Sequence, residues 1–580
     1  MISVVATSSW SLMWMPVLLA AVLQVIVVIK RLFSPLSRVP GPFITKISYV
    51  PIFAYDQRSK RTAWIRRLHD KYGPVVRVSP TEISVASATG IRDIFAGSSS
   101  SGGPYPKSKT FELFKHFGAR NSFTSITSAQ HGWRRKVIGA SYSQSAVLAR
   151  EAATGNIWRT AGNYIHYIGR AGMPAGGNSI AKSVDIHTAN TFFAGDSVSS
   201  YVLLDGLQAL LGNEKHQRLI VNTQEKPGDV LSYFHQEYRE FFNWLNAIKI
   251  FVRAWVPGLG PQVLSERTRV GDKDPKKLNS VWYGGTEYRD FTYKSYLDAK
   301  SELKSNPQSL ARGPITLKLA NNVITGEQIQ TSRNPVVEDP SMRGFESEGN
   351  FHKDAGAASE AMDHLIAGQD TTSETLSHAF QALSMLQNKP IQDKLRAEIA
   401  TLNLPTEHDQ PLQSEQLSHL MRAPYLDAVI KETLRLYPPH TTNIQRTVPA
   451  GGRVLDGLYL TGGAKVGTSA YVVHMNREVF GPDVESWKPE RWLLEDKDQV
   501  RQMEQTLWAF GSGTRGCVGK HLAMVEMKIL LSSLYGRYTT IPDQQREVPL
   551  ESNHFKFRST NRDYSYFPNA GGRIVFAEDI

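Results

Sequence analysis

The chain has 580 residues, of which 41% are hydrophobic and 21% are charged, a balance that excludes a wholly disordered or wholly membrane-embedded protein. Its 66 Lys and Arg residues outnumber its 54 Asp and Glu residues, and the net charge of +12 favours an acidic partner or an anionic membrane surface. No long Lys/Arg block stands out, so nucleic acid is not the expected partner. The single cysteine excludes an internal disulfide and a cysteine-only zinc site. By itself it is either an inert thiol or a residue retained for its chemistry.

The first predicted element is an apolar segment over residues 10–29 that contains no charged residue. About 20 helical residues are enough to cross a hydrocarbon core roughly 30 Å thick. Lys30 and Arg31 follow directly, which predicts that the rest of the chain lies on the cytosolic side. A cleaved signal peptide is the alternative, but it would carry a basic region before a shorter apolar core. We expect a membrane anchor over 1–31, a proline-rich hinge over 32–45 and one large domain over 46–580.

The patterning within that domain is mainly helical. Residues 50–95 combine helical apolar spacing with a β-rich stretch, and residues 230–256 form an aromatic helical candidate. Residues 257–350 are polar, with few periodic runs, and predict long loops and short helices. A strongly helical pattern over 351–437 is followed by short β-like runs over 440–475. The sequence therefore predicts a mainly α fold with small β-sheets, and no nucleotide-binding glycine motif stands between a strand and a helix.

Cys517 lies in a glycine-rich turn, FGSGTRGCVG, just before the last predicted helix. The glycines allow a tight bend and a close approach of the backbone to a flat ligand. A helix N-terminus and the neighbouring Arg515 both favour thiolate over thiol. The alternative is an inert thiol buried in a turn.

This turn resembles the cysteine-ligand loop of the cytochrome P450 family, F-x-x-G-x-R-x-C-x-G. Phe510, Gly513, Arg515, Cys517 and Gly519 occupy every defined position of that motif. The resemblance implies the cytochrome P450 fold and a haem b whose iron is bound by Cys517, with Phe510 beside the cofactor and Arg515 at a propionate. A thiolate ligand pushes electron density onto iron and so favours cleavage of the O–O bond.

Four distant segments resemble the same family in the expected order. Glu432 and Arg435, three residues apart on one predicted helix, resemble the E-x-x-R motif, and Arg491 resembles the third member of its buried ion network. His131 and Arg135 resemble a helix that clasps the haem propionates. Arg446 likewise resembles a propionate-binding arginine on the strand that follows the E-x-x-R helix.

Residues 361–380, AMDHLIAGQDTTSETLSHAF, resemble the family's A-G-x-D-T-T stretch in the helix that crosses the distal haem face. The resemblance implies that Ala367 and Gly368 leave space for dioxygen and that Asp370 and Thr371 relay protons to it. Without the resemblance, the same residues would indicate a helix that begins with an N-cap cluster at Asp370.

Over residues 35–575 the resemblance implies a membrane-anchored monooxygenase of the eukaryotic microsomal type, similar to fungal secondary-metabolism members. Such an enzyme uses O2 and NADPH-derived electrons to oxidise a lipophilic small molecule. The implied partners are NADPH–cytochrome P450 reductase and membrane lipid, with residues 46–580 as the haem–thiolate catalytic domain on the cytosolic side of the endoplasmic reticulum. Arg134, Lys136 and Lys520 are candidates for the reductase face. Substrate contacts are expected from residues 101–128, 230–250 and 440–444, from the start of the distal helix, and from the region of Phe555.

Three alternatives remain open from sequence. A haem–thiolate enzyme that couples phenols, desaturates or isomerises would share every motif. A non-enzymatic haem sensor would have no need of Asp370 and Thr371. A membrane-tethered cysteine hydrolase would need a base near Cys517, for which His521 is the local candidate.

Overall fold

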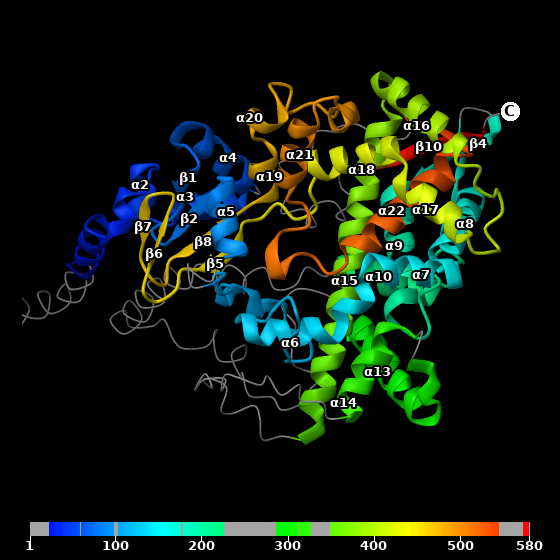
Figure 1. Cartoon of the computed structure of the whole chain (residues 1–580), viewed down its shortest axis with the longest axis horizontal. Helices are drawn as coiled ribbons and strands as arrows, with labels where there is room; N and C mark the ends of the chain where they lie inside the picture. The colour runs from blue at the N-terminus through cyan, green and yellow to red at the C-terminus, as the bar shows by residue number, and fades with distance from the viewer. Residues whose placement is uncertain are drawn as a thin grey trace, which may run out of the picture.

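A computed structural model describes residues 22–58, 60–97, 103–175, 178–225, 286–310, 313–325, 349–543 and 572–578. Helices dominate, and the small sheets lie at two places in the fold, as the sequence predicts (Figure 1). The long helix α15 (Gly349–Ser384) runs through the middle of the molecule, between a part that is rich in strands and a larger helical part.

The strand-rich part joins segments that lie far apart in the sequence. Its helices are α2 (Phe43–Ile47), α3 (Val50–Gln57), α4 (Arg61–Tyr72) and α5 (Ala88–Phe95). Its main sheet has the order β1 (Val75–Arg77), β2 (Glu82–Val85), β8 (Lys465–Thr468) and β5 (Ile444–Thr447). Strand β2 pairs in antiparallel with β1 and in parallel with β8, and β8 pairs in antiparallel with β5. Strands β6 (Arg453–Leu455) and β7 (Leu458–Leu460) form a separate ribbon.

The helical part packs around one large apolar core. Its elements are α6 (Ser128–Ile138), α7 (Gln144–Thr154), α8 (Asn156–Ala171), α9 (Ile186–Val202), α10 (Glu214–Glu225), α13 (Thr286–Ser305), α14 (Ile315–Thr325), α16 (Lys389–Thr401), α17 (Ser414–Arg422), α18 (Pro424–Leu436) and α22 (Lys520–Tyr535). Short helices α19 (Ala470–His474), α20 (Arg477–Phe480) and α21 (Lys497–Thr506) lie between the two parts. A second sheet closes the far end, with the order β3 (Met173–Ala175), β4 (Asn178–Asp185), β10 (Arg573–Glu578) and β9 (Tyr538–Pro542).

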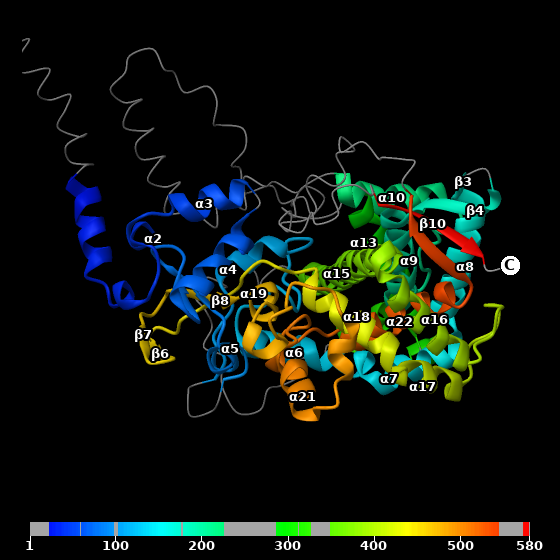
Figure 2. The ribbon, with the colours of Figure 1, turned by 90° about the horizontal axis from the view of Figure 1, so that it is seen from above.

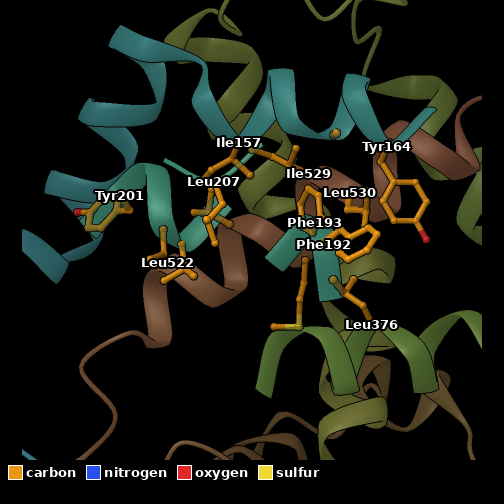
Figure 3. Packing of buried hydrophobic residues seen from close by; sticks show 14 of the residues in the cluster. Ile157, Tyr164, Phe192, Phe193, Tyr201, Leu207, Leu376, Leu522, Ile529 and Leu530 are labelled. Atoms are coloured by element: carbon orange, nitrogen blue, oxygen red, sulfur yellow. The ribbon is translucent and has the colours of Figure 1, made fainter. Parts of the chain in front are cut away.

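Helix α22 anchors the part of the chain that follows Cys517. Its apolar residues Leu522, Val525, Ile529, Leu530 and Leu534, whose spacing predicted this helix, are all buried. Figure 3 shows Leu522, Ile529 and Leu530 among side chains of α8 and α9, with Leu376 of α15 nearby. The turn before α22 is therefore held against a core to which α15 also contributes.

Several sequence predictions fall wholly or partly outside the described residues. Of the predicted anchor over 1–31, residues 1–21 lie outside them, and residues 22–32 are helical. Among the helices that are described, none is long and apolar enough to cross a membrane, so the transmembrane helix is not supported and stays a prediction. The aromatic candidate over 230–256 and the region of Phe555 also lie outside the described residues.

The prediction of loops and short helices over 257–350 is wrong for part of that segment. Helix α13 is 20 residues long and buries Tyr288, Tyr296, Ala299 and Leu303. Tyrosines and an alanine make up most of the buried face of this helix, so a search for periodic large aliphatic residues does not detect the helix.

Candidate functional site

The turn that carries Cys517 is shaped by glycine. Gly511 and Gly513 have φ angles of 64° and 67°, and a Cβ at Gly513 would lie 2.6 Å from the carbonyl oxygen of Phe95. The backbone N–H of Cys517 donates to the carbonyl oxygen of Phe510 at 2.8 Å and closes the turn. The side chain of Cys517 is exposed, three residues before the first residue of α22. The turn thus presents a thiol on the accessible side of a rigid loop.

The surroundings of Cys517 act on its pKa in two opposite directions. Desolvation raises the pKa of the Cys517 thiol, although the N–H groups of Gly519 and Lys520 and the positive charge of Arg135 counteract it. The protein alone therefore favours the neutral thiol. A bound metal ion deprotonates a coordinating thiol, so ionisation here accompanies metal binding.

Five basic side chains from four segments gather beside this turn: Lys107, His131, Arg135, Arg446 and Arg515. Arg135 of α6 donates to the carbonyl oxygen of Gly516 at 3.2 Å. Arg515 donates to the carbonyl oxygens of Ile126 and Thr127 at 3.0 and 2.7 Å, just before α6. Lys107 and Arg446 face each other in an isolated β-bridge.

Burial and mutual repulsion act on this cluster more strongly than the nearby carboxyl groups of Asp363 and Glu360 do. Burial, and then the charge of Arg515, lower the pKa of His131 to about 3 and that of Arg446 to about 9. Burial and the charges of Arg446 and Arg515 likewise hold the pKa of Lys107 well below its usual range. Within the described chain, the buried Nε and Nη1 atoms of Arg446 have no hydrogen-bond partner. Buried cationic donors of this kind require an anionic acceptor. Two carboxylates at the edge of a flat cofactor, as in haem, fit these residues and the accessible thiol.

Lys107 is the member of the cluster that sequence reasoning missed. Its Nζ atom lies 4.4 and 4.2 Å from the ring centroids of Phe111 and Phe123 and donates to the carbonyl oxygen of Phe123. Only the lysine within an otherwise uncharged loop, PYPKS, could have pointed to it.

The distal helix has an unusual exposed face. Between residues 354 and 384 of α15, Ala367 and Thr371 are the exposed residues, and the others are buried or half-buried. They are four residues apart and so lie on one side of the helix. The Oγ1 atom of Thr371 donates to the carbonyl oxygen of Ala367 at 2.7 Å. Because α15 is continuous from Gly349 to Ser384, an N-cap at Asp370 is excluded.

Gly368 has a different environment from the one predicted. A Cβ at this position would lie 2.6 Å from Cγ2 of Val198 on α9. The glycine therefore permits close packing of two helices, and Ala367 is the small residue on the exposed face. Asp370 is half-buried next to Thr371.

The predicted ion network comes together in the structure. Arg435 binds Glu432 through Nε and Nη2, both at 2.8 Å, and Nε of Arg491 lies 3.3 Å from the same carboxylate. The side chains of Glu432 and Arg435 are both 0% exposed. Glu432 also accepts hydrogen bonds from Nε1 of Trp492 and the backbone N–H of Lys488, at 3.0 Å each.

The remaining candidate residues differ in their exposure and in their contacts. Phe510 is half-buried and packs against the large core, with Nζ of Lys520 5.8 Å from its ring. Lys136 and Lys520 are exposed, whereas Arg134 is half-buried and pairs with Glu360 of α15 at 3.3 Å. Arg134 is thus committed to an internal ion pair and is a weaker candidate for a docking surface than the two lysines.

Comparison with known proteins gives consistent matches. The family model described as Cytochrome P450 matches residues 341–566, which include α15, the ion network and the Cys517 turn. A cytochrome P450 monooxygenase of Aspergillus terreus is 26% identical over 522 residues, which cover 88% of this chain and 92% of that protein. Cytochrome P450 monooxygenase gsfF of Penicillium aethiopicum is 25% identical over 519 residues, 88% of each chain. Cytochrome P450 monooxygenase mfmA of Annulohypoxylon moriforme is 44% identical over 134 residues, 23% of this chain and 26% of that protein.

Proposed function

We propose, on the premise that this chain is a member of the cytochrome P450 family, that it uses O2 and NADPH-derived electrons to oxidise a lipophilic small molecule by hydroxylation, epoxidation or a similar reaction. Family membership makes the chain a monooxygenase with haem b as cofactor and a cysteine thiolate as iron ligand. The haem sensor and the cysteine hydrolase are therefore no longer needed as hypotheses. The observation that carries the proposal is the accessible thiol of Cys517 in a cationic cluster with Arg446, whose buried Nε and Nη1 atoms have no hydrogen-bond partner within the described chain.

The residues of this chain would bind haem through its metal and its acidic edge. Cys517 would hold the iron, and the cationic cluster would hold the propionates, with Arg446 offering two unused buried donor atoms. When bound, haem supplies the redox chemistry that activates dioxygen. The Cys517 turn and α22 would fix the position of the sulfur. The turn packs so closely against the backbone of Phe95 that residue 513 has no room for a side chain.

Helix α15 would deliver protons on the opposite side of the cofactor. The hydrogen of the Thr371 hydroxyl is committed to the carbonyl oxygen of Ala367, so the oxygen lone pairs remain as acceptors on the exposed face. A water molecule bound there could be oriented for proton delivery, and the carboxyl of Asp370 on the adjacent residue could hold the proton in transit. The methyl group of Ala367 leaves room on this face for a small molecule.

The cellular setting is part of the same proposal. The uncharged residues 10–29 would anchor the enzyme in the endoplasmic reticulum, with its catalytic domain in the cytosol. Exposed apolar side chains at Phe33, Phe43 and Ile44 would suit a nearby lipid surface. The exposed Lys136 and Lys520 would attract an acidic electron donor such as NADPH–cytochrome P450 reductase. A role in fungal secondary metabolism is part of this proposal, and the fungal origin of the similar monooxygenases supports it.

The test is a comparison of wild-type protein with Cys517→Ser, each purified as the full chain and reconstituted with haemin. Wild-type protein should give the strongly red-shifted Soret band of a thiolate-ligated haem after reduction and CO treatment. Cys517→Ser should bind haem weakly, lack that band and have no monooxygenase activity with reductase and NADPH. His521→Ala serves as the control and should keep the band. Retained turnover in Cys517→Ser, or iron bound through nitrogen in wild-type protein, would overturn the assignment.

A further inference from the structure

The end of α6 lies against α15 (Figure 1, Figure 2), and a tyrosine, a histidine and a glutamate form a buried chain of contacts there. Tyr142 ends the short helix Gly139–Tyr142 that follows α6, and its hydroxyl shares a hydrogen bond with Nδ1 of His364 at 2.9 Å. Nε2 of His364 lies 3.4 Å from Oε1 of Glu360. The three residues are 4%, 6% and 1% exposed. None of them belongs to the cationic cluster or to the exposed face of α15.

The charge of Glu360 decides which nitrogen of His364 carries the proton. Burial favours the neutral acid, but the hydrogen bond and charge of His364, together with the charge of Arg134, lower the pKa of Glu360 to about 2. Its Oε2 atom accepts from the backbone N–H of Ser122 at 2.9 Å and lies 3.3 Å from Arg134. Its Oε1 atom and Nε2 of His364 have no hydrogen-bond partner elsewhere in the described chain. A carboxylate facing Nε2 favours a proton on that nitrogen, which leaves Nδ1 to accept from the hydroxyl of Tyr142.

A buried phenol with a base at hydrogen-bond distance is suited to losing an electron. An oxidised phenol that keeps its proton is a cation, and an unpaired charge inside a protein is costly. At Tyr142 the proton can pass to His364, and the resulting imidazolium would pair with the carboxylate of Glu360, which offsets the cost of burying the charge. Burial holds the pKa of Tyr142 well above its usual range, so the hydroxyl keeps its proton until an electron leaves. The charges of Arg150 and Glu526 also act on Tyr142, in opposite directions.

Two other buried tyrosines lack such a base. The ring of Tyr201 lies 5.4 Å from the ring of Tyr142, but its hydroxyl donates to the backbone carbonyl oxygen of Ser141. Tyr164 is 0% exposed, and its hydroxyl donates to the amide oxygen of Asn190 at 2.9 Å. Carbonyl and amide oxygens accept hydrogen bonds, but they do not take up a proton at neutral pH. An oxidising equivalent that reaches these rings would therefore rest on Tyr142.

The position of this tyrosine links it to the elements that would surround the cofactor. Tyr142 follows Arg135 of the cationic cluster by seven residues, and its partner His364 precedes Ala367 by three residues on α15. Three residues of helix rise roughly 4.5 Å. The Tyr142–His364 pair therefore lies within one helical turn of the exposed face of α15 without forming part of that face.

We propose that Tyr142 is a redox-active residue that gives one electron to haem oxidised by hydrogen peroxide when no substrate is within reach. The phenol loses one electron and the haem gains it, while the O–H bond of Tyr142 breaks and an N–H bond forms at Nδ1 of His364. The products are a neutral tyrosyl radical and an imidazolium beside Glu360. A one-electron reductant of the cell, such as a thiol or ascorbate, would restore the tyrosine as the proton returns from His364. This inference rests on the proposed function and adds protection of the site against its own oxidant.

The experiment looks for the radical directly. Full-length haem-loaded protein without substrate is mixed with hydrogen peroxide, frozen rapidly and examined by electron paramagnetic resonance. Wild-type protein should give a tyrosyl signal whose lines narrow when the protein is produced with ring-deuterated tyrosine. Tyr142→Phe should lose that signal, and its haem absorption should bleach faster in peroxide. His364→Gln should also lose the signal, because glutamine still accepts a hydrogen bond from the hydroxyl but has no basic nitrogen.

A matched control separates this role from a general loss of structure. Tyr164→Phe removes a hydroxyl that is equally buried and hydrogen-bonded but has an amide partner, and it should keep the signal. A signal that is absent from wild-type protein, unchanged in Tyr142→Phe or His364→Gln, or lost in Tyr164→Phe would overturn the role of Tyr142. The CO spectrum is recorded for every protein. An intact red-shifted Soret band with any of these results contradicts only the redox role, whereas absence of that band in wild-type protein contradicts the proposed function.

Discussion

Replacing Arg435 by Met tests how much stability the buried ion network contributes. The guanidinium of Arg435 makes two hydrogen bonds to Glu432 and donates to the carbonyl oxygens of His474, Val484 and Ser486 at 3.3, 2.7 and 3.1 Å. Methionine has a similar length and no donor, so the variant leaves these carbonyls unsatisfied and Glu432 with Arg491 as its remaining cation. Removing one partner from a buried charge network costs roughly 3–5 kcal/mol.

A loss of this size is a large part of the free energy that keeps a domain folded, which is roughly 5–15 kcal/mol. We expect Arg435→Met to unfold at a clearly lower urea concentration in circular dichroism and to be recovered with little bound haem. Arg501→Met is the matched control, because Arg501 pairs with Asp498 at the same three-residue spacing but is 69% exposed. That surface pair is worth about 0–1 kcal/mol. If both variants unfold at the wild-type concentration of urea, the reasoning about burial is refuted.

Three further predictions follow from single contacts. Thr371→Ala should raise NADPH consumption per product and release hydrogen peroxide. Thr375→Ala should not, because both hydroxyls bond back to α15 but Thr375 is buried whereas Thr371 is exposed. Equal coupling in both variants would remove Thr371 from proton delivery. Arg446→Leu should lose haem to an acceptor protein about tenfold faster without destabilising the apoprotein, because the buried Nε and Nη1 atoms of Arg446 have no partner in the described chain and would bind a propionate. Burial raises the pKa of Glu526 to about 8, above that of an unfolded Glu, so its contribution to stability is present at low pH and is lost as pH rises toward 8. Glu526→Gln should remove this loss. Measured by urea unfolding, the free energy of unfolding of the variant relative to wild type should be roughly 2–3 kcal/mol higher at about pH 7.5 than at about pH 5.5.

Local patterns predicted the elements that depend on their own sequence. The apolar spacing after Cys517 identified α22, and the β-like runs at 440–475 identified β5 to β8. Glycine at 513 could be read as a backbone requirement before the contact with Phe95 was known. In these cases the residues that form the sequence pattern are also the residues that cause the local structure.

Properties that arise between segments were harder to predict. The pKa of Cys517 depends on desolvation by the folded protein, which outweighs the helix N-terminus that the sequence displays. Gly368 was assigned to the ligand side, but its neighbour Val198 lies on another helix. Lys107 joins the cationic cluster only because a β-bridge places it opposite Arg446. Each of these properties depends on how segments that are distant in the sequence pack together.

The parallel pairing of β2 with β8 sets the order in which the protein can be assembled on the ribosome. Residues 82–84 find their partners only at 465–467, and Arg446 reaches Lys107 through the same sheet. At 5–20 residues per second, roughly 380 intervening residues take about 20–80 s to synthesise, during which the edge of β2 stays open to wrong partners. Haem capture must therefore be a late event, and cells that make this enzyme need chaperone capacity early and free haem only at the end.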